Sequence, residues 1–240
     1  MNKRKNNLTL FSGSADNVTV IIPAYNEEQT IEKVIDTARE NKNVTEVIVV
    51  DNCSTDKTYR LAKKKQVKVV RCKNQGKGYA MEAGLKYASN GIVAFIDGDI
   101  GNYNNKIIEK LTAPIIADKA DFVKSTFDRQ GGRVTELLAK PLIKLLYPVA
   151  TKFTQPLSGM IAGRREFFKA IILEKDYAVD IAILIDMIKL GAKIKQVNIG
   201  KVENKSKELS GLTEMAQQVA NAILKRTVNE AYSLEKAEEN

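Results

Sequence analysis

Short apolar runs alternate with longer, more polar segments along the first 100 residues of the chain. The runs are rich in valine and isoleucine and end at polar or turn-forming residues, which predicts buried β-strands. The predicted strands are residues 18–22, 46–50, 67–70 and 91–96. The segments between them favour helices at residues 27–40, 56–65 and 76–88. Strands that alternate with helices in this way indicate an α/β fold with an open, mostly parallel sheet.

The pattern is less regular after residue 100. It predicts one more strand at 121–124, and helices at 104–117, 133–147, 178–190 and 208–233. We find no linker composition and no internal repeat, so we expect a single domain with two halves. The expected halves are residues 17–100 and 101–233, and residues 1–16 and 234–240 are expected to be flexible.

A leucine stripe in the segment 133–147 has two interpretations. The stripe consists of Leu137, Leu138, Leu142, Leu145 and Leu146. It is compatible with a peripheral helix on a membrane surface. A helix that turns this face to the protein core is the commoner arrangement, and we prefer it.

The bulk composition is that of a globular protein. Of the 240 residues, 44% are hydrophobic and 28% are charged, and no apolar run is long enough to span a membrane. No apolar segment follows the basic residues near the N-terminus, so we expect no signal peptide. Cys53 and Cys72 form neither a metal-binding spacing nor a disulfide framework. We therefore expect reduced thiols and a cytoplasmic protein.

The net charge of +9 limits the partners that we expect. A nucleic-acid partner is not expected, because the chain has no recognition motif and few aromatic residues to stack on bases. Small anionic substrates explain the excess of basic residues equally well. The chain contains no histidine, which excludes mechanisms that need an imidazole base or ligand.

Two carboxylates follow the predicted strand 91–96. They belong to Asp97 and Asp99, with Gly98 between them. Ligands of open α/β sheets bind at the carboxyl ends of the strands, and both carboxylates can reach one divalent cation there. Mg²⁺ and Mn²⁺ prefer such oxygen ligands together with the phosphates of a nucleotide. The alternative is an ordinary turn, since aspartate and glycine both favour turns.

Three more polar motifs come at equivalent places. Residues 23–28 (Pro-Ala-Tyr-Asn-Glu-Glu) follow the first predicted strand, residues 51–56 (Asp-Asn-Cys-Ser-Thr-Asp) follow the second, and residues 76–78 (Gly-Lys-Gly) open a predicted helix. Each alone has an ordinary explanation as a turn, a helix N-cap or a loop. The glycine-rich fingerprint of NAD-binding domains is missing after the first strand. All three motifs are expected at the same edge of the sheet as Asp97.

Together, these motifs resemble the nucleotide-sugar glycosyltransferases of the GT-A fold, family two and its relatives. The resemblance covers roughly residues 17–100 and implies a donor site for a nucleoside diphosphate sugar in that half. It implies that Lys77 stabilises the diphosphate and that Asp99 and Asp97 hold a divalent metal, Mg²⁺ or Mn²⁺. The residues that it places at the donor are Pro23, Ala24, Tyr25, Glu27, Asp51, Asn52, Lys77, Asp97 and Gly98.

The second half resembles the glucosyl-3-phosphoglycerate synthase family and its mannosyl counterpart. The motifs that carry this resemblance are residues 131–137, 139–142, 155–159, 180–186 and 196–200. Members transfer a hexose, with retention, to the 2-hydroxyl of 3-phosphoglycerate. The implied acceptor site is Gly132, Arg133, Val134 and Thr135, and arginine suits bidentate binding of an anion. The alternative is a helix start with an exposed arginine.

The chain departs from that family at three positions. Asn204 stands where the family has a metal-ligating histidine, and Ser206 stands where it has an asparagine. Asp180 replaces a glutamate and is one methylene shorter. An asparagine oxygen still suits a hard cation, but it binds Mn²⁺ more weakly than an imidazole does.

We therefore interpret the chain as a metal-dependent glycosyltransferase with a small anionic acceptor. The resemblance implies a homodimer, and it implies catalytic roles for Lys77, Asp180 and the backbone carbonyl of Leu157. A helix N-cap is the alternative role for Asp180. The rival functions are a lipid-phosphate glycosyltransferase, a nucleotidyltransferase and a fold relative without activity. The donor base and the sugar, glucose or mannose, stay open.

Overall fold

Seven strands form one mixed sheet in the computed structural model of the chain, which describes residues 16–102, 104, 106–128, 132–202 and 209–238. In sheet order the strands are β3 (Lys68–Arg71), β2 (Val44–Asp51), β1 (Val18–Ala24), β4 (Ile92–Phe95), β6 (Ile161–Arg164), β5 (Phe122–Thr126) and β7 (Ile194–Asn198). Only the pairs that include β6 are antiparallel. The other six strands therefore end at the same edge of the sheet.

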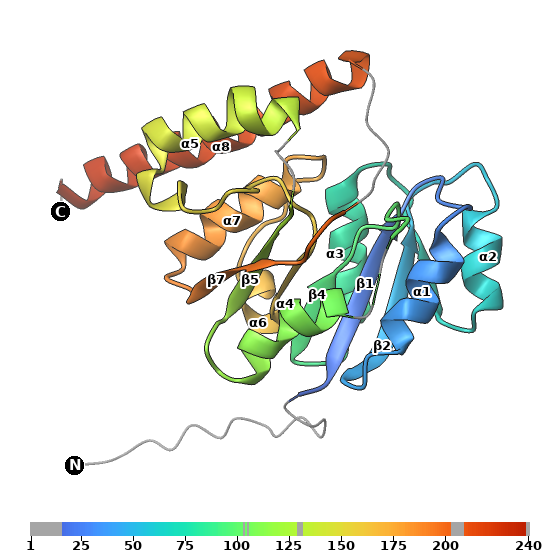
Figure 1. Cartoon of the computed structure of the whole chain (residues 1–240). Coiled ribbons are helices and arrows are strands. Elements are labelled where there is room, and N and C mark those ends of the chain that lie inside the picture. The colour runs from blue at the N-terminus through green and yellow to red at the C-terminus, as the bar shows by residue number, and fades with distance from the viewer. Residues whose placement is uncertain (1–15, 103, 105, 129–131, 203–208, 239–240) are drawn as a thin grey trace, which may run out of the picture.

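Helices cover both faces of this sheet (Figure 1). They are α1 (Ile31–Arg39), α2 (Thr58–Lys64), α3 (Lys77–Tyr87), α4 (Lys106–Ile116), α5 (Lys140–Leu146), α6 (Arg165–Lys169), α7 (Val179–Lys189) and α8 (Leu209–Glu238). A π-helical turn, η1 (Thr135–Ala139), runs directly into α5, and a short 3₁₀ turn, η2 (Pro148–Ala150), follows it. The helical backbone is thus continuous over residues 133–146.

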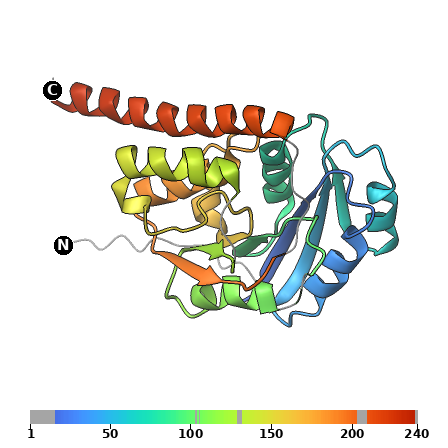
Figure 2. The ribbon, with the colours of Figure 1, turned by 45° about the horizontal axis from the view of Figure 1, so that its top comes forward.

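The alternation of side chains along the strands produces two cores. Ile22 on β1 packs with α1 and α4 on one face, whereas the neighbouring Ile21 packs with α3 on the other. The second core also contains α7, and α5 and α8 lie over the outer side of α7 (Figure 1). In Figure 2, α8 lies beside α5 and continues beyond it.

Most of the predicted elements are confirmed, with shifted boundaries. The predicted helix 27–40 begins only at Ile31, because residues 26–28 are bonded to the loop after β2 instead. The strands β6 and β7 and the helix α6 were not among the predicted elements. The helix α8 runs to Glu238, so residues 234–238, which are predicted to be flexible, have a helical backbone. Residues 1–15 and 239–240, also predicted to be flexible, lie outside the described residues.

The leucine stripe of residues 133–147 divides between two surroundings. Leu138, Leu142 and Leu146 pack against the core, which confirms the core-facing interpretation for them. Leu137 and Leu145 are 78% and 76% exposed, so that interpretation was wrong for these two. Among the helices that the structure describes, none is both long enough and apolar enough to cross a membrane.

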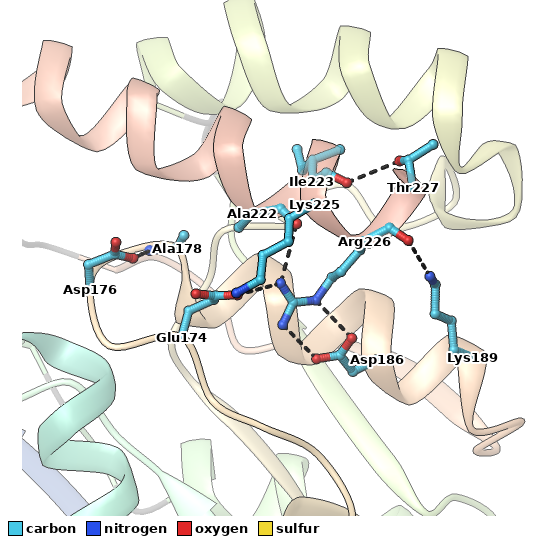
Figure 3. Close-up of polar contacts among 10 residues, drawn as sticks. All are labelled: Glu174, Asp176, Ala178, Asp186, Lys189, Ala222, Ile223, Lys225, Arg226 and Thr227. Carbon is cyan, nitrogen blue, oxygen red and sulfur yellow. Dashed lines mark hydrogen bonds and ion pairs between the residues drawn. The ribbon is translucent and has the colours of Figure 1, made fainter. Parts of the chain in front are cut away.

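A buried arginine fastens α8 to α7 (Figure 3). Arg226, only 8% exposed, donates from Nε and Nη2 to the two carboxylate oxygens of Asp186, each at 2.8 Å, and from Nη1 to Glu174 at 2.8 Å. In return, Lys189 at the end of α7 donates to the backbone carbonyl of Arg226 at 2.7 Å. The long C-terminal helix is therefore held by bidentate, charge-assisted bonds as well as by apolar packing.

Replacing this arginine should destabilise the fold. Arg226→Met leaves the Asp186 carboxylate without its cation, so we expect the free energy of unfolding to fall by about 3 kcal/mol. Urea denaturation measures the change. Lys225→Met is the control, because its ammonium is exposed and reaches Glu174 only at 3.4 Å. Equal stabilities of the two variants would contradict this account of the α7–α8 contact.

Candidate active site

The loops after β1 and β2 are bonded into one unit. The backbone N–H of Asn26 donates to Ser54 Oγ at 3.0 Å, and Asn26 Oδ1 accepts from the N–H of Thr55 at 2.9 Å. The N–H of Glu27 donates to Thr58 Oγ1 at 2.7 Å. Asn26 has a φ of 57°, a left-handed conformation that asparagine tolerates better than most residues. The predicted motifs 23–28 and 51–56 therefore do lie side by side.

Asn52 holds the third motif against the first two. Its amide accepts a bond from the N–H of Gly76 at 2.8 Å and donates to the Gly76 carbonyl at 3.1 Å. Gly76 has a φ of 147°, and a β-carbon there would collide with the carbonyl of Lys175, so the position requires glycine. These contacts set the start of α3 and hence the place of Lys77.

Asp51 has a buried oxygen at this edge of the sheet. The residue is 2% exposed, and its Oδ2 lies 3.5 Å from Arg71 Nε. Its Oδ1 has no hydrogen-bond partner among the described residues. A buried carboxylate oxygen without a partner is costly, which favours a ligand N–H group as its partner.

Lys77 stands between two carboxylates that come from different halves of the chain. Its Nζ lies 2.9 Å from Asp97 Oδ1 and 2.8 Å from Asp180 Oδ2. Burial opposes the charge on Lys77, but Asp180 and Asp97 outweigh it and raise the lysine pKa. Lys77 is therefore a fixed cation at neutral pH. The three residues bring the carboxyl end of β4 and the amino ends of α3 and α7 together in one site.

Asp180 is buried and only partly satisfied. It is 4% exposed, and its Oδ1 has no partner among the described residues. Burial raises the pKa of its carboxyl group, and the nearby Lys77 and Lys124 hold that rise down. The alternative role as a helix N-cap was wrong, because α7 is preceded by Ala178 and the Asp180 side chain is bonded to Lys77.

The glycines of the site allow close approach. A β-carbon on Gly159 would overlap both Lys77 Nζ and the Asp97 carboxylate, so only glycine leaves room for this ion pair. Gly98 is buried against the carbonyl of Pro23, and its own carbonyl accepts a bond from Thr30 Oγ1 at 2.6 Å. The turn that carries Asp97 and Asp99 is thereby tied to the loop after β1.

Asp97 and Asp99 fit a divalent cation that also binds phosphate. In the part of the chain that the structure describes, no three His, Cys, Asp or Glu side chains are grouped so that they could hold a metal by themselves. Magnesium is typically bound by one or two carboxylates together with substrate phosphates and water, and this turn provides the two carboxylates of such a donor set. Asn204 and Ser206 lie outside the described residues.

The predicted acceptor residues gather at the start of one helix. Arg133 is exposed and opens the helical stretch 133–146, and Val134 and Thr135 are buried behind it. The carbonyl of Gly132 accepts the N–H of Glu136 at 3.0 Å, which closes the first turn. A helix N-terminus with an adjacent guanidinium suits an anion. The alternative, a helix start whose exposed arginine binds no ligand, has the same geometry.

The chain matches a known enzyme family over most of the residues just described. Residues 19–172 match glycosyl transferase family 2. The chain belongs to this family. A curated relative, glucosyl-3-phosphoglycerate synthase of Mycolicibacterium smegmatis, is 34% identical over 233 residues, which cover 87% of this chain and 77% of the relative.

Solved structures of family relatives agree with this fold. A glucosyl-3-phosphoglycerate synthase from Mycobacterium tuberculosis, in complex with Mn²⁺, UDP-glucose and phosphoglyceric acid, has a TM-score of 0.84 and 37% identity. The match covers 88% of this chain and 79% of that one. A second structure of that enzyme, with Mg²⁺ and UDP, has a TM-score of 0.83 and 36% identity over 88% of this chain and 79% of that one. The predicted GT-A fold and the predicted glycosyltransferase family are thus confirmed.

One buried residue beside this site, Lys124, was not predicted from the sequence. Lys124 on β5 is fully buried, and its Nζ donates to the backbone carbonyl of Asp180 at 2.9 Å. The signal was present in the sequence, since a lysine interrupts the apolar strand that begins at Phe122. The charged residue was taken as the end of the strand, whereas β5 continues to Thr126.

Proposed function

We propose that the chain transfers a hexose from a nucleoside diphosphate sugar to the 2-hydroxyl of 3-phosphoglycerate, with retention of configuration. The observation that carries the proposal is the position of Lys77. Its ammonium lies between the carboxylates of Asp97 and Asp180, at the edge of the sheet where the predicted motifs meet. Relatives with the name glucosyl-3-phosphoglycerate synthase support the acceptor and the sugar. We therefore propose UDP-glucose as the donor.

The donor half supplies a specific contact for the base. Asp51 Oδ1 is buried and has no partner among the described residues, and uracil offers one N–H donor on its ring. We propose that Asp51 accepts this N–H. The neighbours Pro23, Ala24, Tyr25 and Glu27 surround the base and ribose, while Asn52 keeps the loop before Lys77 in place. Gly98 leaves room for the ribose.

The reaction needs charge neutralisation on the leaving diphosphate. Asp97 and Asp99 would hold Mg²⁺ or Mn²⁺, which supplies positive charge to the diphosphate oxygens when bound. Lys77 donates to the same diphosphate from the protein side. The acceptor 2-hydroxyl bonds to the anomeric carbon as the bond to the diphosphate breaks on the same face. The hydroxyl proton passes to the leaving phosphate oxygen, and the Leu157 carbonyl orients the hydroxyl. Asp180 Oδ1, which has no partner among the described residues, accepts a bond from a substrate hydroxyl.

Arg133 is the residue that distinguishes the acceptor classes. Charge-assisted hydrogen bonds to an anion are worth roughly 1.5–3 kcal/mol each. Arg133→Ala should therefore raise the KM for 3-phosphoglycerate by about ten- to a hundredfold in steady-state assays. Arg133→Lys should recover only part of the loss, because a single ammonium lacks the bidentate geometry.

The control for that prediction is nucleotide affinity, which should stay nearly unchanged in Arg133→Ala. Weaker nucleotide binding with an unchanged acceptor KM would contradict the phosphoglycerate proposal. It would favour a lipid-phosphate acceptor, for which the exposed Leu137 and Leu145 offer an apolar surface. A relative of that type, dolichol-phosphate mannosyltransferase of Pyrococcus furiosus, is 30% identical over 76% of this chain and 55% of its own length.

The remaining expectations concern assembly and compartment. We propose a cytoplasmic homodimer that binds no nucleic acid, because the implied substrates are soluble metabolites and the family resemblance implies a dimer. Light scattering of the purified chain measures the mass in solution. A monomeric mass of 26.6 kDa at assay concentration would contradict the dimer.

A further inference from the structure

Lys124 is a fully buried ammonium that the proposed mechanism does not use. It is 0% exposed on β5, where it pairs in register with Ile161 of β6 and Gln196 of β7. Lysine is almost never buried without a charged or polar partner, because removing an ammonium from water is costly. Its position in the centre of the acceptor half therefore needs an explanation.

Lys124 contacts Asp180, which belongs to the candidate active site. Its side chain lies on the same face of β5 as Phe122, which is the face that α7 covers. The ammonium donates to the backbone carbonyl of Asp180 in the first turn of α7. Three charged groups face it, namely Asp180 on α7, Lys77 on α3 and Asp97 after β4. Two cations and two carboxylates thus make up one cluster, in which Lys124 and Asp180 are buried and Asp97 is partly exposed.

Lys124 and Asp180 influence each other's pKa. Burial lowers the pKa of Lys124 to about 8, and the Asp180 carboxylate opposes that fall. Lys124 in turn is one of the two cations that hold down the pKa of Asp180. Within the cluster, Lys77 alone balances only one of the two carboxylates. Lys124 supplies the second positive charge.

We infer that Lys124 is a positioning residue that holds the first turn of α7 and keeps Asp180 as a carboxylate directed at Lys77 and the substrate. This inference rests on the proposed function, because it assigns a task within the transfer reaction. An apolar side chain of similar length fills the space between the sheet and the helix, but it leaves the Asp180 carbonyl without its donor and removes one cation from the cluster, so some stability is lost. A purely structural role predicts this loss alone, with kcat and its pH profile unchanged.

The test is Lys124→Met in the full chain, assayed with UDP-glucose, 3-phosphoglycerate and Mg²⁺. We expect kcat to fall by about ten- to a hundredfold, the usual effect of removing a group that orients a reacting residue. The KM for UDP-glucose should change by less than about twofold, because Lys124 donates its hydrogen bond to Asp180, which is not among the residues placed at the donor. The Tm should fall, because the Asp180 carbonyl loses its donor and the carboxylates lose one cation. Without the second cation the pKa of Asp180 rises, so the acidic limb of the kcat profile should move to higher pH.

Two control variants separate this role from general effects. Lys189→Met removes a similar bond, from an ammonium to a backbone carbonyl at 2.7 Å, but at the far end of α7. It should leave kcat and the pH profile unchanged. Val123→Ala opens a cavity beside Lys124 on the opposite face of β5 and should lower the Tm without moving the acidic limb.

The outcomes of this test distinguish a failure of the inference from a failure of the proposed function. If the unaltered chain transfers glucose and Lys124→Met keeps its kcat and pH profile, the inference is wrong and the proposed function stands. A Lys124→Met protein that fails to fold also overturns the inference, since the ammonium would then be a structural requirement. If the unaltered chain makes no glucosylated product, the proposed function fails first.

Discussion

Lys77→Met is expected to lower kcat by about a thousandfold. The ammonium lies between Asp97 and Asp180. In the proposed reaction, the leaving diphosphate would gain negative charge beside it as the bond to the sugar breaks. Removing one preorganised donor to such a charge typically costs two to three orders of magnitude, about 10²–10³. The loss should appear in kcat more than in KM, because the interaction strengthens in the transition state.

Two further variants sharpen this prediction. Lys77→Arg should not restore activity, because Gly159 leaves no room around Nζ for a wider guanidinium. Lys86→Met, on the exposed far end of α3, is the matched control and should behave like the unaltered chain. A Lys77→Met enzyme that retains more than about a tenth of its kcat would contradict the role given to this lysine.

Asp99→Ala should abolish transfer almost completely, by about a thousandfold or more. A divalent cation held by Asp97 and Asp99 would contribute several kcal/mol of charge stabilisation to the departing diphosphate. An excess of EDTA should have the same effect on the unaltered chain, and added Mg²⁺ or Mn²⁺ should restore turnover. Steady-state assays with and without the chelator measure both effects.

Asp118→Ala is the control for the metal prediction. Asp118 is exposed and pairs with Arg164 at the opposite edge of the sheet from Asp97, so its loss should change neither activity nor the metal requirement. Full turnover in the presence of EDTA would contradict the metal role of Asp99. Loss of activity in Asp99→Ala that excess metal overcomes would still agree with it.

The donor half is predictable from the sequence because its signals are local. Buried parallel strands appear as uninterrupted apolar runs, and each polar motif directly follows one of them. The pairing of residues 23–28 with 51–56 then follows from the topology, and the bonds of Asn26 and Glu27 to Ser54, Thr55 and Thr58 bear it out. The helix boundary at Ile31 was misplaced because these cross-loop bonds compete with helical ones.

The acceptor half is harder to predict because its contacts are distant in the chain. Lys77 and Asp180 are 103 positions apart, and only the resemblance to a known family connected them. The strand β6 has only four residues and one of them is Gly163, so its sequence carries little strand signal. The reason for this glycine, the nearby ring of Phe168, becomes visible only in the structure. Lys124 was missed because a buried lysine looks like a strand end until its partner on α7 is known.

The most direct test of the proposed function is the product itself. The purified chain is incubated with UDP-glucose, 3-phosphoglycerate and Mg²⁺, and the products are identified by mass spectrometry and NMR. We predict UDP and a glucosylated phosphoglycerate in equal amounts, with the α-configuration of the donor retained at the anomeric carbon. UDP-glucose that stays intact, or glucose that appears only on a lipid phosphate offered in parallel, would contradict the account.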